Sequence, residues 1–328
     1  RSVKINSIII VSMDTFIVRK IWRKIGKKYN HKYYNKGDKE IKDKKFIENA
    51  IKGVYIAPAY DNVKINLKKD EKVLAIGYDE KGRSQYVYNK KYTQSQSYKK
   101  FDKMITFGKN FNKINKKIDD DLYTVKDSKN KQIAIILKLI MECQFRIGND
   151  VYSKKNKSYG TTTLQGKHMK IKKDEIIIDF NGKKNVRNIC TIKNKKLVKT
   201  LKQTRRTIGK EDRIFTYRKG EKYFNIKSSD VNKYLKQFGK FTAKDFRTWG
   251  ANIELIKQLM KNKKTELKDC IKNVSIKLHN TPAICKSNYL DPELMEFYKN
   301  DPEGFKKHFN FKTDTSLYNQ YIQFLEEL

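Results

Sequence analysis

Five polar residues carry side-chain types that together suit one reaction, the transfer of a phosphoryl group to a tyrosine. They are Arg146, Lys167, Arg247, Asn280 and Tyr289, and each stands at the edge of a predicted helix or at a predicted turn. A phosphodiester resists attack because negative charge builds on its nonbridging oxygens, and arginines stabilise that charge without a metal. A general acid that protonates the leaving oxygen adds about 10²–10⁴-fold. The set predicts phosphotyrosine chemistry with no metal and no cofactor.

The two arginines lie next to predicted helix ends. Arg146 follows the apolar run 133–145 and precedes Gly148. Arg247 falls in the first turns of a helix that the capping pair Thr242 and Asp245 predicts. Amide donors at a helix start favour a bound phosphate, and a guanidinium adds a bidentate fork. Both positions suit a phosphate, although an arginine at a helix end often only complements the helix dipole.

The other three residues lie at predicted turns. Gly166 predicts a hairpin tip that carries Lys167, and a helix with a cap and a proline at 281–282 separates Asn280 from Tyr289. Taken singly, a hairpin lysine is usually solvated, and one of the 20 tyrosines of this chain is usually packed in a core. The pattern gains its meaning from the five residues as a set.

The segments around these residues predict a mostly helical domain with one sheet. Apolar residues recur at helical spacing from 101 to 118, and 133–145 is apolar enough for a buried helix. Between 161 and 192 the period changes to two, with an Asn181-Gly182 hairpin turn. The predicted strands of this meander are 161–164, 168–171, 175–180 and 186–192. Further helices are expected at 228–239, 243–260 and 266–278, and after 281 and 291.

Short β-like runs separated by turn residues precede this half, at 54–58, 62–67, 72–79 and 83–88. The polar stretch 89–98 lacks periodicity and is predicted to be a linker. We expect an α+β protein in which a small β-rich N-terminal domain joins a mostly α-helical domain with a β-meander. The expected divisions are a segment of uncertain role (1–50), the β-rich domain (51–95), the helical domain with the five residues (96–300) and a helical extension (301–328).

Charge indicates the partner. The 328 residues include 75 Lys+Arg against 36 Asp+Glu, and this formal net charge of +39 predicts a polyanion such as double-stranded DNA. With 38% hydrophobic residues the chain can form a real core, which excludes a disordered basic tail. Lys, Asn and Ile are also what an AT-rich genome encodes, so mutational bias can contribute to the excess of lysine.

Cysteine spacing and hydropathy predict an intracellular protein with reduced thiols. Cys143, Cys190, Cys270 and Cys285 lie far apart without CxxC spacing, which argues against a disulfide framework and a zinc ribbon. No apolar run reaches the roughly 18 residues of a membrane helix. The first residues also lack the features of a signal peptide. We therefore expect no membrane partner.

The motifs FRIG, TLQGKH, KDFRTWGAN and NTPAICKSNYLDP resemble, in this order and spacing, type IB DNA topoisomerases, especially the compact poxvirus and giant-virus form. The run GYDEKGRSQYVY resembles the N-terminal module of that family. The resemblance implies a monomeric clamp that relaxes supercoiled duplex DNA by transient single-strand cleavage, strand rotation and religation, without ATP or metal. It also implies activity at sites of DNA replication or transcription, which are the viral factory or the virion if the chain is viral.

The resemblance assigns roles to the five residues. Tyr289 matches the nucleophile that becomes joined to the 3′ end of the cut strand and expels a 5′-hydroxyl. Arg146, Arg247 and Asn280 match the groups around the nonbridging oxygens. Lys167 matches the hairpin lysine that is implicated as general acid to the leaving 5′ oxygen. The region 96–300 is thus expected to be the catalytic domain.

The same resemblance implies DNA contacts at Tyr86, Tyr88, Tyr152, Lys244 and Lys286. The two tyrosines of the strand 83–88 belong to the module that the family lays against the major groove, so 51–95 is expected to bind DNA. Core packing is the alternative for tyrosines in a sheet. An ordinary surface position is the alternative for the other three.

One position departs from the family pattern. Poxvirus enzymes have a His where this chain has Asn280, nine residues before the tyrosine, whereas His279 falls where they have Gly. Asn donates a hydrogen bond to a phosphate oxygen but carries no charge. We favour Asn280, with His279 as the alternative. The whole prediction also requires that the Tyr289 hydroxyl be open to DNA and within reach of both arginines.

Two other classes share part of this pattern. Tyrosine recombinases and integrases use the same Arg, Lys, Arg, His and Tyr arrangement, but they usually carry a His three residues before the second Arg, where this chain has Lys244. A noncatalytic basic DNA-packaging protein would share the charge, although all five active positions here are chemically competent. The sequence favours the topoisomerase.

Overall fold

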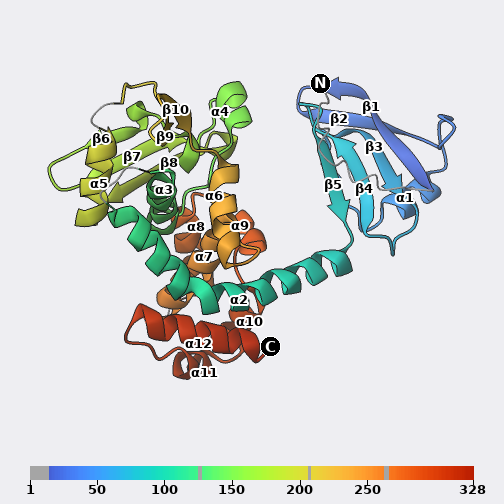
Figure 1. The fold of residues 1–328 in the computed structure, drawn as a ribbon. Coiled ribbons are helices and arrows are strands. Elements are labelled where there is room, and N and C mark those ends of the chain that lie inside the picture. The colour runs from blue at the N-terminus through green and yellow to red at the C-terminus, as the bar shows by residue number, and fades with distance from the viewer. Residues whose placement is uncertain (1–14, 125–127, 206–207, 262–265) are drawn as a thin grey trace. The chain divides into compact units, whose positions relative to one another are not determined.

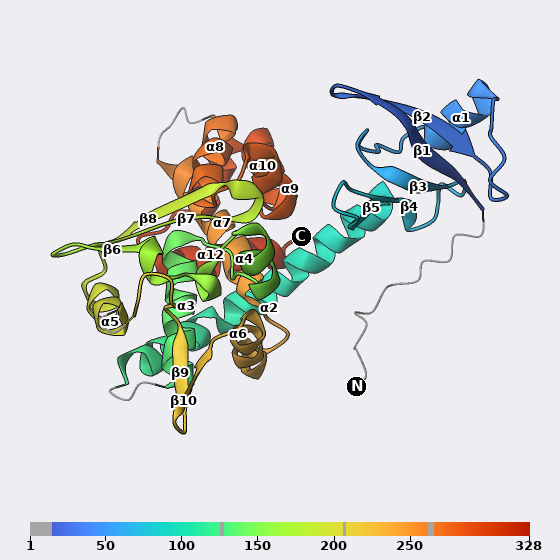
Figure 2. The ribbon, with the colours of Figure 1, turned by 90° about the horizontal axis from the view of Figure 1, so that it is seen from above.

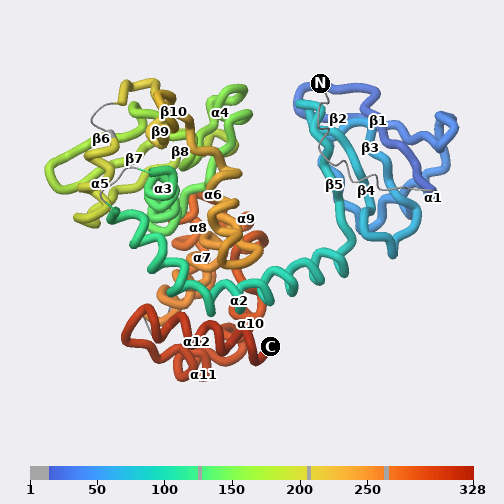
Figure 3. Tube along the Cα trace, viewed as in Figure 1, coloured from blue at the N-terminus to red at the C-terminus, as the bar shows by residue number. Residues whose placement is uncertain are grey.

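The computed structural model describes residues 15–124, 128–205, 208–261 and 266–328. The chain divides into two compact units, Arg1–Lys100 and Phe101–Leu328 (Figure 1). The first is built on a sheet and the second mainly on helices, as the Cα trace in Figure 3 shows. This arrangement confirms the predicted α+β class. Within the described ranges, no helix combines the length and apolar character that crossing a membrane requires.

A five-stranded antiparallel sheet in the order β2-β1-β3-β4-β5 forms the first unit. Its strands are β1 (Phe16–Ile25), β2 (Lys28–Tyr34), β3 (Asp61–Asn66), β4 (Val73–Tyr78) and β5 (Ser84–Tyr88). Helix α1 (Lys44–Ile51) begins at Asp43, whose side chain accepts a hydrogen bond from a backbone N–H of the first turn. The core contains Ala50 of this helix together with Ile17, Val63, Ile65 and Ala75 of the sheet.

Three predicted strands, 62–67, 72–79 and 83–88, are confirmed as β3, β4 and β5. The run 54–58 is not a strand, because β1 already pairs with β3 and the buried guanidinium of Arg19 donates to the carbonyls of Ile56 and Ala57. The sheet also begins at Phe16, well before the division expected at residue 51. Residues 16–51 therefore contribute two strands and a helix to this unit.

Helices form most of the second unit. They are α2 (Lys90–Tyr123), which begins in the last residues of the first unit, α3 (Lys129–Cys143), α4 (Asp150–Asn156), α5 (Lys195–Arg205), α6 (Ser228–Leu235), α7 (Ala243–Met260), α8 (Leu267–Lys277), α9 (Pro282–Asn288), α10 (Pro292–Asn300), α11 (Pro302–His308) and α12 (Asp314–Glu326). Strands β6 (Met169–Ile171), β7 (Ile176–Asn181) and β8 (Arg187–Ile192) form a three-stranded sheet, and β9 (Thr216–Lys219) and β10 (Lys222–Asn225) form a hairpin. The described residues also contain the 3₁₀ turns η1 (Thr161–Thr163), η2 (Gly166–His168), η3 (Lys183–Asn185) and η4 (Lys236–Phe238). In both Figure 1 and Figure 2, α5 and β6 lie on the opposite side of this unit from α9.

The stretch 89–98 was predicted to be a linker, and that prediction is wrong because the stretch lies in α2. Asn89 starts the helix: its Oδ1 accepts the N–H of Lys91 at 2.8 Å, and its carbonyl accepts the N–H of Thr93 at 3.0 Å. Polar side chains do not prevent a helix whose surface is solvated. Apolar periodicity starts only at Phe101, where α2 joins the core of the second unit.

The core of the second unit is organised around α3 and α7. The N–H of Thr242 donates to the Asp245 carboxylate at 2.7 Å, which is the capping pair that the sequence predicted for α7. Trp249 of α7 is buried and packs against the rings of Phe107, Phe111, Tyr318 and Tyr321. Truncation of such a buried Trp typically costs about 3–5 kcal/mol. These contacts fix α7, which carries Arg247, against α2 and α12.

The predicted meander is confirmed as the three strands β6, β7 and β8, with its Asn181-Gly182 turn between β7 and β8. The run 161–164 is not a strand but the 3₁₀ turn η1, because its buried threonines bond to another segment of the chain. The turn at Gly166 and Lys167 is also not a hairpin tip. It is the 3₁₀ turn η2 before β6, and its two N–H groups donate to the carbonyls of residues 212 and 210.

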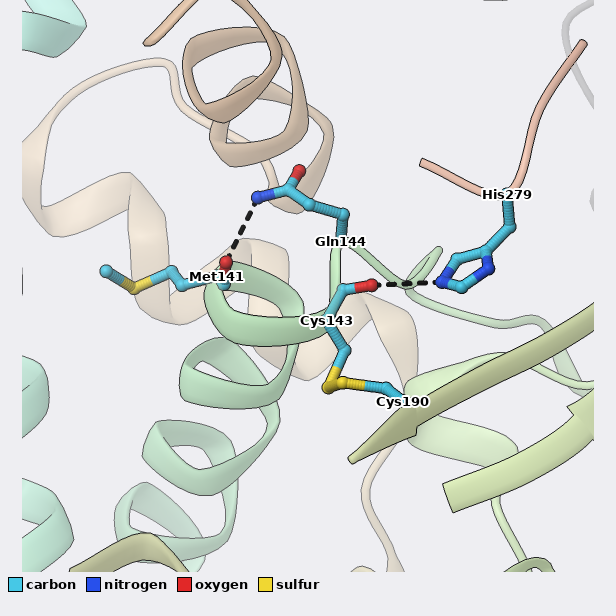
Figure 4. Close-up of a disulfide and its surroundings, with 5 residues drawn as sticks. All are labelled: Met141, Cys143, Gln144, Cys190 and His279. Carbon is cyan, nitrogen blue, oxygen red and sulfur yellow. Dashed lines mark hydrogen bonds between the residues drawn. A yellow bond between two sulfur atoms is a disulfide. The ribbon is translucent and has the colours of Figure 1, made fainter. Parts of the chain in front are cut away.

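Cys143 and Cys190 form a disulfide, which overturns the prediction that these thiols are reduced (Figure 4). The bond joins the end of α3 to β8 across 47 positions of sequence, with the Cα atoms 5.7 Å apart. Spacing along the chain gave no signal because tertiary packing brings the two elements together. Cys270 and Cys285 are free and buried.

Candidate active site

Tyr289 lies between α9 and α10 and is held through its backbone. The helix starts predicted at Thr281 and Asp291 are both present, since each side chain accepts a backbone N–H of the helix that follows. The fully buried Asn252 of α7 donates from Nδ2 to the Tyr289 carbonyl at 3.0 Å, and its Oδ1 accepts the N–H of Asp291 at 2.8 Å. Sequence reasoning missed Asn252 because its position, little more than one turn beyond Arg247, gives no sign of what it contacts.

Arg247 is 2% exposed and contacts the tyrosine directly, with its guanidinium carbon 5.0 Å from the ring centroid of Tyr289. Nη2 donates to the Leu278 carbonyl at 3.1 Å, and Nη1 donates to the Gln144 carbonyl. These carbonyls fix the plane of the guanidinium. Within the described part of the chain Nε has no hydrogen-bond partner. A buried, unused donor beside the phenol is suited to an oxygen of a bound phosphate.

Arg146 lies in a segment without regular secondary structure that follows α3. Its carbonyl accepts both the N–H and the hydroxyl of Thr161, at 2.8 and 3.1 Å. The Ile147 carbonyl accepts the same two groups of Thr162, at 2.7 and 2.9 Å. A Cβ added to Gly160 would lie 2.7 Å from the Arg146 carbonyl oxygen, so the two segments pack backbone against backbone. The sequence gave no warning of this support, since the threonines were predicted to form a strand.

Asn280, and not His279, contacts an arginine of the site. The Nη2 of Arg146 donates to Oδ1 of Asn280. His279 adopts a left-handed backbone conformation (φ 52°), and its Nε2 donates to the Cys143 carbonyl at 3.2 Å (Figure 4). Burial lowers the pKa of His279 to about 4, so its imidazole is neutral near pH 7. The geometry favours Asn280 at the position where the family has a His.

Positive charge surrounds the Tyr289 side chain. Burial by itself raises the pKa of the phenol, but the charges of Arg247, Arg146 and Lys244, with a hydrogen bond from Arg247, outweigh burial and lower that pKa below its usual value. Burial lowers the pKa of Arg247 to about 10, so this guanidinium stays protonated at neutral pH. A phenol whose pKa is lowered by cations is a more available nucleophile.

The Tyr289 side chain is 7% exposed, which departs from the expected open hydroxyl. The preceding helix α9 buries only Cys285 among its residues. Most residues of α9 are therefore exposed, although the tyrosine that follows the helix is buried.

Lys167 does not join this cluster. Its Nζ pairs with the Glu211 carboxylate at 2.6 Å, and this hydrogen bond raises the pKa of Lys167. No hydrogen bond or ion pair within the described residues links it to the four other predicted residues. A raised pKa makes the Lys167 ammonium a weaker proton donor.

Two other lysines occupy the hairpin turn of the meander. Lys183 and Lys184 follow Gly182 between β7 and β8, and both are exposed. The carbonyl of Asn181 in this turn accepts the N–H of Tyr159 at 2.9 Å. Tyr159 directly precedes the glycine and threonines that hold the Arg146 segment, so the turn lies beside that segment. The Asn-Gly signal that located the hairpin also located these lysines.

The predicted DNA contacts are exposed: Tyr86 and Tyr88 on β5, Tyr152 on α4, Lys244 on α7 and Lys286 on α9. The rings of Tyr86 and Tyr88 are stacked with centroids 6.0 Å apart. Core packing is thereby excluded for these two tyrosines. The lysines lie on the two helices that carry the site, and contact of all five residues with DNA stays a prediction.

Comparison with known proteins decides the family. A sequence profile of the catalytic core of eukaryotic DNA topoisomerase I matches residues 89–314. The chain belongs to this family. The DNA topoisomerase 1B of Acanthamoeba polyphaga mimivirus is 33% identical over 296 residues, which are 85% of this chain and 87% of the relative. The DNA topoisomerase 1B of Vaccinia virus (strain Copenhagen) is 28% identical over 240 residues, 70% of this chain and 73% of the relative.

The resemblance to compact viral type IB topoisomerases is thus confirmed, and so is the predicted enzyme class. The range matched to the topoisomerase core contains all five predicted catalytic residues. A crystal structure of the XerH site-specific recombinase bound to palindromic difH substrate is also similar, at a TM-score of 0.38 and 16% identity over 69% of this chain and 59% of that chain. That likeness is too low to support an argument about recombination.

Proposed function

We propose that this chain relaxes supercoiled double-stranded DNA through a covalent 3′-phosphotyrosine intermediate formed on Tyr289. The observation that carries the proposal is the convergence on one phenol of two arginines from distant parts of the chain. Arg247 contacts the ring, and Arg146 adds its charge while it donates to Asn280. This is the arrangement that attack on a phosphodiester requires.

The reaction exchanges one ester for another. The Tyr289 oxygen forms a bond to a backbone phosphorus, the bond from that phosphorus to the 5′ oxygen breaks, and the phenolic proton is lost to solvent. The 5′ oxygen takes up a proton and leaves as a hydroxyl. Rotation of the free strand relaxes the duplex, and the reverse exchange reseals it. Because one phosphoester is present at every stage, no nucleotide needs to be consumed.

Each residue around Tyr289 has a separate task in this proposal. The unused Nε of Arg247 and the guanidinium of Arg146 stabilise the charge on the nonbridging oxygens. Asn280 orients Arg146. When the phosphate binds, the side-chain amide of Asn280 gives up its present partner and donates a neutral hydrogen bond to the phosphate. Lys244 adds charge that favours the phenolate. His279 fixes the chain behind the site and takes no part in proton transfer.

We further propose that a lysine of the β7–β8 turn, Lys183 with Lys184 as the alternative, protonates the leaving 5′ oxygen. The family role belongs to a lysine on a hairpin. The β7–β8 turn meets this condition and lies beside the Arg146 segment, whereas Lys167 lies in η2 and is paired with Glu211. Lys167 remains the candidate from sequence alone, and alanine variants separate the three lysines.

Alanine variants of Lys167, Lys183 and Lys184 each remove one positive charge, so they serve as controls for one another. Loss of the general acid should slow single-turnover cleavage by about 10²–10⁴-fold. A substrate with sulfur in place of the 5′ bridging oxygen needs no protonation and should restore the rate of that variant alone. Restoration in Lys167→Ala, with normal cleavage by the other two variants, would return the role to Lys167.

The exposed residues Tyr86, Tyr88, Tyr152, Lys244 and Lys286 are proposed to contact duplex DNA, with the chain acting as a monomeric clamp where DNA is replicated or transcribed. The net charge of +39 supports this proposal. Release of many counterions makes binding by such a protein fall steeply with salt. For six phosphate contacts, the affinity for DNA should fall about a thousandfold between about 50 and 200 mM salt. Relaxation that does not change over this range would contradict the clamp.

Denaturing gel electrophoresis with a labelled nicked duplex tests the central step. The wild type should form a covalent adduct in EDTA without ATP, Tyr289→Phe should form none, and Tyr223→Phe is the matched control because Tyr223 is 70% exposed on the β9–β10 hairpin. No adduct with the wild type would leave only DNA binding, as in a packaging protein. Exchange of strands between two duplexes in place of relaxation would indicate a recombinase.

A further inference from the structure

Helix α4 carries Tyr152 yet buries none of its seven residues. Its start is fixed locally, since the Asn149 side chain accepts the N–H of Val151 at 2.9 Å. A helix of this length is not stable in water by itself. A contact with the rest of the unit is therefore needed to hold α4 in a defined position.

Arg213 provides that contact. Its Nη1 donates to the carboxylate of Asp150, the first residue of α4, at 2.8 Å. Its Nε donates to the Thr162 carbonyl at 3.1 Å, and Nη2 donates to the same oxygen. Within the described residues, no other ion pair and no other side-chain hydrogen bond joins α4 to a distant part of the chain. The backbone of Arg213 is itself fixed, because the next residue donates its N–H to the Leu164 carbonyl at 3.0 Å.

Thr162 is also one of the two residues that hold the Arg146 segment. Its N–H and hydroxyl both donate to the Ile147 carbonyl, and Thr161 makes the same pair of bonds to the Arg146 carbonyl. One guanidinium thus ties the start of α4 to the turn that fixes the backbone of Arg146. This link is short, because Asp150 and Arg146 are only four positions apart in the sequence.

We propose that Arg213 is a positioning residue that couples the seating of α4 on DNA to the placement of Arg146 at the reacting phosphate. The inference rests on the proposed function. All three hydrogen bonds of the guanidinium go to Asp150 and Thr162, so Arg213 acts through Arg146 and not on the reacting atoms. A planar guanidinium is needed to hold this fork between two oxygens on separate segments. A lysine at position 213 would therefore replace only some of these hydrogen bonds.

Three variants separate the two arms. Arg213→Met removes both, Asp150→Asn removes the charge of the α4 arm alone, and Arg213→Lys keeps the charge without the fork. The single-turnover rate of adduct formation at saturating nicked duplex and the Kd for that duplex are measured separately. We expect Arg213→Met to lower the rate by about 10- to 100-fold, because a misplaced catalytic group costs that much. Asp150→Asn should mainly raise Kd, and Arg213→Lys should recover part of the rate.

Arg218→Met is the matched control. It loses the same charge five positions away, and the Nε of Arg218 bonds only within its own hairpin, to the Gly220 carbonyl at 2.9 Å. Its rate should equal that of the wild type at saturating DNA. Thermal unfolding of every variant identifies any that fail to fold, and in that event Arg213→Lys carries the test.

The decisive measurement repeats Arg213→Met in an Arg146→Lys background. If Arg213 acts through Arg146, Arg213→Met should lower the single-turnover rate little further once Arg146 is already lysine. An equal further loss in both backgrounds would show a merely structural role and overturn the proposal. A wild type that forms no adduct sinks the proposed function and the coupling with it, whereas a normal adduct and an unchanged rate in Arg213→Met overturn the coupling alone.

Discussion

Replacement of Asn252 by alanine is expected to disturb Tyr289 more than it disturbs the rest of the fold. The Asn252 side chain donates to the carbonyls of Thr248 and Tyr289, at 2.8 and 3.0 Å, and accepts the N–H of Asp291 at 2.8 Å. The Thr248 carbonyl keeps its partner in the helix when the side chain is removed. The Tyr289 carbonyl and the Asp291 N–H, which flank the phenol, both lose this contact.

The loss can be estimated from these bonds. A buried polar group that loses its hydrogen bond costs about 1–3 kcal/mol, so two such groups lower the free energy of unfolding by about 2–6 kcal/mol. Both bonds hold the chain next to Tyr289, and therefore part of the loss appears as displacement of the phenol. A displacement on the order of 1 Å lowers a reaction rate by about 10²-fold.

Urea unfolding gives the free energy, and single-turnover adduct formation below the unfolding transition gives the rate. Asn110→Ala is the matched control, because Asn110 on α2 makes the same bond to the residue four positions earlier, Thr106 at 2.9 Å, but touches no part of the site. Its effect should stay within about 0.5 kcal/mol. If Asn252→Ala loses stability and keeps the wild-type rate, Asn252 does not position Tyr289.

Three further predictions concern stability. Loop entropy predicts that loss of the disulfide over its 47-residue separation lowers the free energy of unfolding by about 4 kcal/mol, so dithiothreitol should shift the urea midpoint of the wild type and leave that of Cys190→Ser unchanged. Burial lowers the pKa of His279 from 6.5 to about 4, so its neutral form contributes stability above pH 6.5 that is lost as the pH falls toward 4. Urea titrations across this pH range should show the loss of stability. The rate of adduct formation per folded molecule should show no imidazole titration near pH 6–7. A Cβ at Gly108 would lie 2.5 Å from the Trp249 ring and 2.7 Å from Ile322, so Gly108→Ala should lower the free energy of unfolding by about 1–3 kcal/mol in the same assay.

Local signals in the sequence predicted much of the frame. The cap of α7 and the starts of α9 and α10 were predictable because capping involves residues only two or three positions apart. The β7–β8 turn was predictable because Asn-Gly favours its backbone conformation. The four residues that meet at the site were found by their chemical types and their family resemblance, since no local rule brings positions 146 and 280 together.

Features that depend on tertiary packing escaped the sequence. The disulfide joins a helix end to a strand, and the buried threonines of η1 bond to a neighbouring segment in place of a sheet. Gly166 predicts a hairpin tip at Lys167, whereas hydrogen bonds to the carbonyls of residues 210 and 212 hold both residues in a 3₁₀ turn. In each case a partner far along the chain outweighed the local preference.

The end of α3 explains why the site forms where it does. The last carbonyls of a helix have no partner within it, and here Gln144 adopts a left-handed conformation (φ 52°) that stops the helix and leaves these groups to other segments (Figure 4). The Gln144 side chain donates to the Met141 carbonyl, His279 to the Cys143 carbonyl, and Arg247 to the Gln144 carbonyl. The negative end of the helix dipole favours the cationic donor. The carbonyls at the end of α3 therefore bind α7 and the segment before α9 by hydrogen bonds that cannot form within the helix. Arg146 follows Gln144 by two residues in the sequence and so lies next to both.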